Sequence, residues 1–152
     1  MRMENIGGKS VNNIILFVNG KCAAAGNRLR KSIESVVSCQ HLEIQRSIKD
    51  LSKRLNRFPR EIDLAVLFAA SKDQLSELLS LRELLNDVRI ILILPDRGRE
   101  TISKGHLLRP RFLSYADGDL TDVIAVLSKM IVRLNYEKNR LNPRDGQDER
   151  RC

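Results

Sequence analysis

The sequence predicts an α/β protein in which a parallel sheet lies between two layers of helices. Three short apolar runs carry this prediction, at residues 14–18, 62–69 and 89–94. Segments with helical spacing of apolar residues separate the runs, and buried strands alternating with helices are typical of parallel sheets. At 152 residues the chain is long enough to bury one core without metals or disulfides.

The first strand follows residues 1–12, which we expect to form a flexible lead-in. The strand Ile14–Val18 closes on Asn19 and Gly20, as expected for a buried central strand that ends in a turn. From Gly26 onward, apolar residues recur at spacings of three and four with basic residues opposite them. This pattern predicts an amphipathic helix.

The second strand and helix are predicted over residues 42–58. Residues 42–46 alternate apolar and polar, which favours a half-buried strand near a sheet edge. Ser47 and Asp50 form a capping signature, and apolar residues then keep helical spacing as far as Pro59. The predicted helix is short and strongly basic.

The third strand, residues 62–69, precedes a second capping signature formed by Ser71 and Gln74. Leucines at helical spacing then predict a helix that stops near Asn86. The fourth strand ends at Pro95, because proline lacks the N–H group that a central strand would use.

Weaker signals follow the fourth strand. They predict a short helix over residues 101–104, a fifth strand over residues 111–115 and a final helix capped by Asp119 or Thr121. Polar residues then predominate, so we assign residues 13–137 to one domain and residues 138–152 to a disordered tail.

Composition narrows the class of protein. The formal charge of +8 favours association with acidic partners. Net charge affects association and solubility, but it does not identify a function. Cys22, Cys39 and Cys152 lack metal-ligand spacing, so we expect free thiols, no metal and no cofactor. No apolar run is long enough to cross a membrane, and the first ten residues do not resemble a secretory signal. We therefore expect a cytoplasmic protein.

The order and lengths of these elements resemble the receiver domain of bacterial two-component response regulators, over roughly residues 13–135. The run I-D-L-A-V-L-F at residues 62–68 is similar to the receiver strand that carries the phosphorylated aspartate. Residues 111–120 are similar to the fifth strand entering the last helix. The resemblance implies a flavodoxin-like three-layer sandwich with a five-stranded parallel sheet of order 2-1-3-4-5.

Receivers hold Mg²⁺ with an acidic pair after strand one and carry a phosphoacceptor Asp at the end of strand three. A Ser or Thr ends strand four and a Lys ends strand five. By this resemblance, the corresponding positions are occupied by Asn19, Gly20, Phe68, Leu94, Pro95 and Tyr115. These side chains cannot perform that chemistry, so we predict a degenerate receiver, or pseudo-receiver, in which Phe68 and Tyr115 fill the former pocket.

The predicted function is a non-enzymatic module for signal transduction that binds a signalling protein or a second copy of itself. Two basic clusters are candidates for contact. The first surrounds the second helix and contains Arg46, Lys49, Lys53, Arg54, Arg57 and Arg60. The second is the predicted interaction surface, because the resemblance implies dimerisation or output contacts there, and contains Arg97, Arg99, Lys104, Arg109 and Arg111. Solvated basic side chains without a partner explain either cluster equally well.

Two alternatives come from other classes of protein. Cys22 and Arg28 have the spacing of phosphatases whose thiolate attacks a phosphate held by backbone amides and that arginine. Leu29 replaces the hydroxyl that such enzymes keep, and three alanines after Cys22 favour a helix. Electrostatic binding of nucleic acid is the other alternative, weakened by an aromatic content of 4%.

Overall fold

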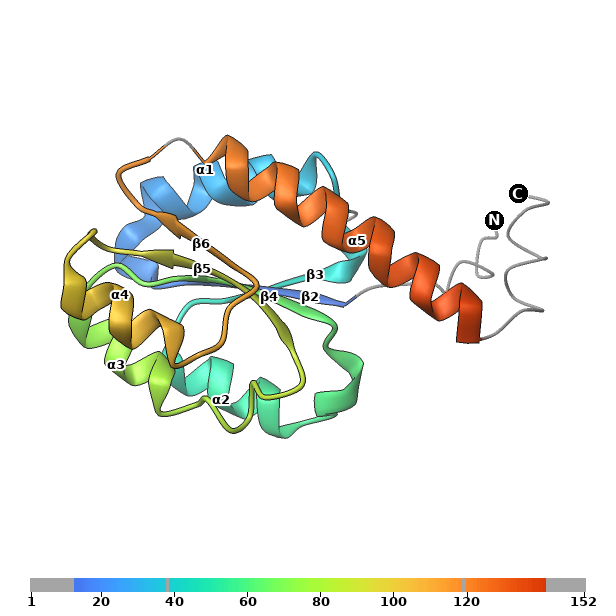
Figure 1. Cartoon of the computed structure of the whole chain (residues 1–152), viewed down its shortest axis with the longest axis horizontal. Helices are drawn as coiled ribbons and strands as arrows, with labels where there is room; N and C mark the ends of the chain where they lie inside the picture. Colours follow the sequence, from blue (N-terminus) through green and yellow to red (C-terminus); the bar gives the residue numbers. More distant parts are fainter. Residues whose placement is uncertain (1–12, 38, 119, 142–152) are drawn as a thin grey trace.

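The computed structural model describes residues 13–37, 39–118 and 120–141. These residues form one parallel five-stranded sheet covered by helices on both faces (Figure 1). The strands are β2 (Ile14–Val18), β3 (Leu42–Gln45), β4 (Leu64–Phe68), β5 (Arg89–Leu94) and β6 (Phe112–Tyr115). Their order in the sheet is β3-β2-β4-β5-β6, which confirms the predicted order 2-1-3-4-5.

In the described part of the chain, five α-helices connect or follow the strands. They are α1 (Ala23–Glu34), α2 (Ile48–Asn56), α3 (Lys72–Leu79), α4 (Arg99–His106) and α5 (Thr121–Leu141). Helices α1 and α5 cover one face of the sheet, and α2, α3 and α4 cover the other (Figure 1). The connections between the described elements contain the 3-10 helices η2 (Gly20–Cys22), η3 (Cys39–His41) and η4 (Pro59–Glu61).

The sheet separates two apolar layers, because successive side chains of a strand point to opposite faces. Phe17 and Leu92 belong to the layer beneath α2, α3 and α4, whereas Leu16 and Ile93 belong to the layer beneath α1 and α5. Every residue of β2 and β4 is buried. This explains why their sequences are continuously apolar, while edge strand β3 alternates.

Both capping signatures are confirmed. The Ser47 hydroxyl accepts the Asp50 backbone N–H at 3.1 Å, and the Ser71 hydroxyl accepts that of Gln74 at 3.1 Å. Helix α3 nevertheless ends at Leu79, well before the predicted end near Asn86. The Ser80 hydroxyl donates to the Glu77 carbonyl, and residues 80–86 continue as turns. Leu81 and Leu85 are buried in these turns, so the apolar spacing continues beyond the end of the helix.

Two further boundaries differ from the sequence prediction. Helix α4 is longer than the predicted residues 101–104, and just before it Asp96 accepts the Gly98 backbone N–H at 2.8 Å. Helix α5 continues to Leu141, so residues 138–141 are helical and do not belong to a disordered tail. Those residues include good helix formers, which polarity alone did not reveal. Residues 1–12 and 142–152, predicted as lead-in and tail, lie outside the described residues.

Among the described residues, no helix combines the length and apolar character needed to cross a bilayer.

Gly26 lies at a close approach of α1 to the sheet. A Cβ atom at this position would lie 2.8 Å from Cγ1 of Val18, which is too close for two carbon atoms. Val18 is β-branched and buried, so its side chain cannot easily turn away. We expect Gly26→Ala to destabilise the protein by about 1 kcal/mol despite the better helix propensity of alanine.

Chemical denaturation followed by circular dichroism measures this effect. Gly20→Ala is the matched control, because no atom lies within 4 Å of a Cβ at position 20. Equal stability of the two variants would contradict the close approach of α1 to Val18.

Candidate functional site

The predicted site residues meet at the carboxyl edge of the sheet. Strand β2 pairs with β4, β4 with β5, and β5 with β6, all in parallel, so the ends of these strands lie side by side. The structure therefore gathers at this edge the residues Asn19, Gly20, Phe68, Leu94, Pro95 and Tyr115. Their proximity agrees with the receiver resemblance. None of them carries a carboxylate or a side-chain ammonium group.

The turn after β2 uses Asn19 for backbone hydrogen bonds. Its side-chain Oδ1 accepts the Lys21 backbone N–H at 2.8 Å, and its carbonyl accepts that of Cys22 at 2.9 Å. The N–H of Gly20 donates to the Arg46 carbonyl at 3.1 Å, which ties this turn to the end of β3. The neutral Asn19 amide thus shapes a turn and supplies no charge for a divalent cation.

The aromatic rings of Phe68 and Tyr115 lie in different apolar layers. Phe68 is buried in the layer beneath α1 and α5, whereas Tyr115 packs against the layer beneath α2, α3 and α4. The register explains this separation, because Phe68 is opposite Ile93 and Tyr115 is opposite Leu94, one residue further along β5. The two rings therefore do not fill one pocket together, contrary to our expectation.

Asp96 contributes a carboxylate to this edge that sequence analysis did not identify. It lies in the loop after β5, and its Oδ1 accepts the Gly98 backbone N–H. That hydrogen bond, the facing Thr101 hydroxyl and the positive charge of Lys72 lower the pKa of Asp96. The Thr101 hydroxyl is buried and makes no well-formed hydrogen bond. An Asp two residues before a Gly is a turn signal that could have revealed this loop.

A second polar contact links the β5–α4 and β6–α5 loops. Arg97 Nη2 donates to Asp117 Oδ1 at 3.3 Å, and its guanidinium lies 4.1 Å from the centre of the Tyr115 ring. This cation–π contact occupies the end of β6, where a receiver places its lysine. Among the described residues, no three His, Cys, Asp or Glu side chains come together as metal ligands.

The predicted interaction surface is divided between the two ends of α4. Arg97 and Arg99 lie near its start, whereas Arg109 and Arg111 lie beyond its end. Arg97 pairs with Asp117, and Lys104 approaches Glu100 at 3.8 Å. The five cations therefore do not form one uncompensated patch.

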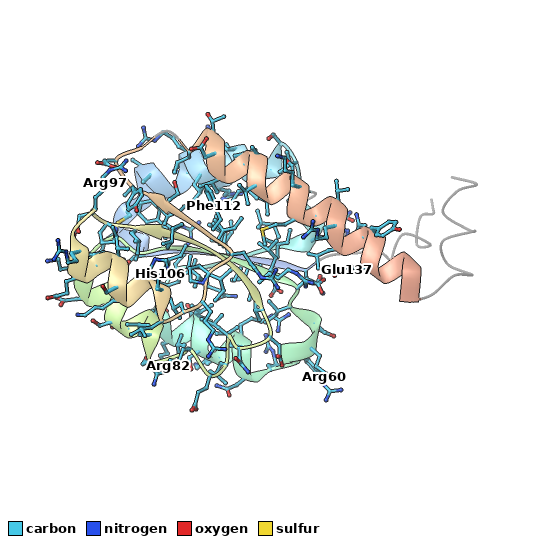
Figure 2. All side chains as sticks on the ribbon, viewed as in Figure 1. Arg60, Arg82, Arg97, His106, Phe112 and Glu137 are labelled. Carbon is cyan, nitrogen blue, oxygen red and sulfur yellow. The ribbon has the colours of Figure 1, made fainter. Side chains whose placement is uncertain are left out.

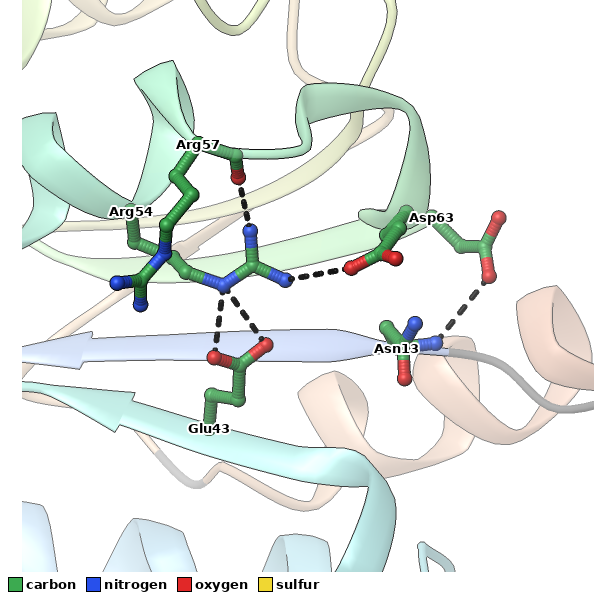
Figure 3. A network of polar contacts seen from close by, with 6 residues as sticks. Asn13, Glu43, Arg54, Arg57 and Asp63 are labelled. Carbon is green, nitrogen blue, oxygen red and sulfur yellow. Dashed lines mark hydrogen bonds and ion pairs between the residues drawn. The ribbon is translucent and has the colours of Figure 1, made fainter.

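One residue of the first basic cluster, Arg54, is buried in the structure. The Arg54 side chain is 7% exposed, and its Nε contacts both Glu43 carboxylate oxygens, at 2.8 and 3.1 Å (Figure 3). Its Nη2 lies 3.7 Å from Glu61, and its Nη1 donates to the Arg57 carbonyl. The hydrogen bond to Glu43 is the largest influence that raises the pKa of Arg54. Arg54 is therefore a structural residue of the α2–β3 contact and not part of an exposed basic surface.

Cys22 and Arg28 do not form a phosphate-binding loop. The residues between them start α1, so their backbone N–H groups enter a helix instead of surrounding an anion. Cys22 is half-buried against the layer beneath α1 and α5, whereas Arg28 is exposed. This geometry gives the phosphatase alternative no support.

Comparisons with solved structures identify the fold. A CheY-like receiver domain from Methanospirillum hungatei JF-1 has a TM-score of 0.63 at 16% identity, with 83% of this chain and 98% of that chain covered. The signal receiver domain of an HD domain-containing protein from Pseudomonas fluorescens Pf-5 gives 0.65 at 17%, covering 86% and 94%. A putative pilus assembly-related protein from Burkholderia pseudomallei K96243 gives 0.58 at 13%, covering 84% and 92%. No family model and no curated protein matches the sequence.

The class that these observations define is the flavodoxin-like α/β sandwich with the 2-1-3-4-5 sheet. Within that class, this chain has the fold of response regulator receiver domains. At these identities the likeness establishes the fold alone, and function has to be argued from the site.

Proposed function

We propose that this protein is a pseudo-receiver: a non-enzymatic, cytoplasmic regulatory module that acts through protein–protein contacts without aspartyl phosphorylation. The observation that carries the proposal is Phe68 at the end of β4, where the resemblance implies a phosphoacceptor aspartate. Phe68 is 5% exposed and packs in an apolar layer, so this position offers neither a nucleophile nor space for a phosphoryl group.

The loops around Phe68 support the same conclusion. Asn19 replaces an acid after β2, and Leu94 replaces the hydroxyl that follows the phosphoryl group when a receiver switches. Arg97 stacks on Tyr115 where the receiver lysine would reach the phosphate. A receiver scaffold without this switch can still bind partners. A signalling protein or a second copy of the chain is the partner that we propose, with α4, β6 and α5 as the contact region.

Incubation of the full chain with acetyl phosphate and Mg²⁺ tests the proposal. We expect intact-mass spectrometry to show no added phosphoryl group, because no carboxylate lies at the end of β4. Light scattering should give the same molar mass before and after the treatment. A functional receiver domain treated in parallel confirms that the phosphodonor is active.

A phosphoryl adduct on the native chain would overturn the proposal. Asp96→Asn and Asp117→Asn then form a matched pair that locates the adduct, since each removes one carboxylate from the loops at the carboxyl edge. Loss of the adduct in Asp96→Asn alone would make Asp96 a displaced phosphoacceptor.

A further inference from the structure

A basic pocket lies at the end of the sheet opposite the receiver-type site. In Figure 2, Arg97 lies toward one side of the molecule, and Glu137, the ion-pair partner of the pocket residue Arg89, lies toward the other. The pocket has a volume of about 310 Å³ and opens between the amino ends of β5 and β6 and the side of α5. Its lining residues are Arg89, Arg111, Val126, Lys129, Met130 and Arg133.

Tertiary structure brings these cations together from three segments. Arg89 is the first residue of β5, and Arg111 immediately precedes β6. The two strand starts are adjacent, since the Arg111 backbone N–H donates to the Ile90 carbonyl at 2.7 Å. Lys129 and Arg133 lie four residues apart on α5, so they are neighbours on one face of that helix. Sequence analysis identified Arg111 alone.

The positive charge of this pocket is poorly compensated. Arg89 donates to Glu137 at 2.8 Å, so one of the four cations has an acidic partner. The side chains of Arg111, Lys129 and Arg133 make no hydrogen bond or ion pair with another described residue. Like charges at a spacing of four residues repel each other on a helix. An anion in the pocket would remove this repulsion.

We propose that this pocket binds a small molecule that carries two or more phosphoryl groups and a planar or apolar moiety. Arginine guanidinium groups bind phosphate oxygens through paired N–H donors, and lysine adds a mobile point charge. Val126 and Met130 supply apolar surface beside the cations. A methionine thioether contacts aromatic rings favourably, which suits a nucleotide base. The volume lies at the lower end of the range that small-molecule pockets occupy.

The observations favour a small molecule over nucleic acid. The free cations line a hollow, whereas a duplex requires cations spread along a surface that follows its backbone. At the far end of the molecule, Arg97 is paired with Asp117 and Lys104 with Glu100. The pocket shares no residue with the carboxyl edge, although Arg111 and α5 also belong to the contact region proposed above.

Isothermal calorimetry on the full chain tests the proposal, with ATP as the nucleotide probe and inorganic pyrophosphate as the probe for phosphate alone. We expect ATP to bind more tightly than pyrophosphate and to raise the melting temperature of the protein as the ATP concentration rises. The affinity for ATP should fall when salt is added. The double variant Lys129→Gln/Arg133→Gln should raise the dissociation constant at least about tenfold. Both substitutions affect exposed side chains, so the fold should persist.

Lys49→Gln/Lys53→Gln is the matched control. These two lysines are also exposed and four residues apart on a helix, and their loss changes the net charge equally, but they lie outside the pocket. We expect less than about a twofold change in the dissociation constant.

Several results would overturn the proposal. If neither ATP nor pyrophosphate binds at low salt, the pocket is not a phosphate site. If both double variants lose affinity for ATP equally, the attraction depends on net charge and not on this pocket. Equal affinity for ATP and pyrophosphate would exclude a role for Val126 and Met130. Binding of duplex DNA that depends on Lys129 and Arg133, without ATP binding, would instead establish a nucleic-acid surface.

Discussion

Phe17→Ala is expected to lower the free energy of unfolding by about 3–5 kcal/mol. Phe17 is fully buried in β2, opposite Gln45 of β3 and Leu67 of β4. Its ring belongs to the layer beneath α2, α3 and α4. Alanine would remove most of this apolar surface and leave a cavity that the flanking strands cannot close, because their register is fixed by backbone hydrogen bonds.

Urea denaturation followed by far-ultraviolet circular dichroism measures this loss. Val132→Ala on α5 is the control, since Val132 is 68% exposed and alanine is a better helix former. We expect a change of no more than about 0.5 kcal/mol for the control. A similar small change for Phe17→Ala would show that β2 is not a buried inner strand of the sheet.

Arg54→Ala is expected to cost about 2–4 kcal/mol of stability. The substitution removes a buried aliphatic stem from the α2–β3 contact and leaves Glu43 without its partner. The Glu43 side chain is 38% exposed and can regain water, which keeps the cost below that of stranding a fully buried charge. The Arg57 carbonyl also loses its donor, next to Phe58, whose φ of 53° is left-handed. The α2–η4 turn should therefore loosen.

Two comparisons separate packing from charge. Arg54→Met keeps most of the aliphatic volume, so we expect it to cost about half as much as Arg54→Ala. Arg30→Ala is the matched control for a surface pair, because Arg30 bonds Glu34 four residues along α1 at 3.2 Å but is 43% exposed. Its removal should cost less than about 0.5 kcal/mol. Equal losses for Arg30→Ala and Arg54→Ala would contradict the buried role of Arg54.

The strands were predictable because burial leaves a direct mark on sequence, and the receiver resemblance then implied their order. Strands β2, β4 and β5 are covered on both faces and read as continuous apolar runs, whereas the edge strand β3 alternates. The hydroxyl caps of Ser47 and Ser71 were equally legible, since a cap depends on residues three positions apart. The end of α3 was not, because turns after Leu79 keep leucines buried without helical geometry.

The candidate site divides in the same way. The side chains at the strand ends follow directly from the sequence once the strands are placed, so the sequence already indicated Phe68 near the end of β4, where it lies opposite Ile93. The position of the Asp96 carboxylate, by contrast, depends on the backbone N–H that it accepts from Gly98 and on the facing Thr101 hydroxyl. Two arginines of the same sequence also have different environments, because Arg54 is buried in an ion pair whereas Arg133 lines an open pocket. Residue type alone cannot distinguish these two cases.

The sequence alone therefore determined the strands and the position of Phe68 near the end of the third one, because each depends on residues close together along the chain. The order of the strands followed from the receiver resemblance. Tertiary structure alone decided that Phe68 and Tyr115 lie on opposite faces of the sheet, since this depends on the register between strands. It also decided that Arg89, Arg111, Lys129 and Arg133 surround one pocket. Those four residues belong to three segments, and only the packing of α5 across the starts of β5 and β6 brings their charges together.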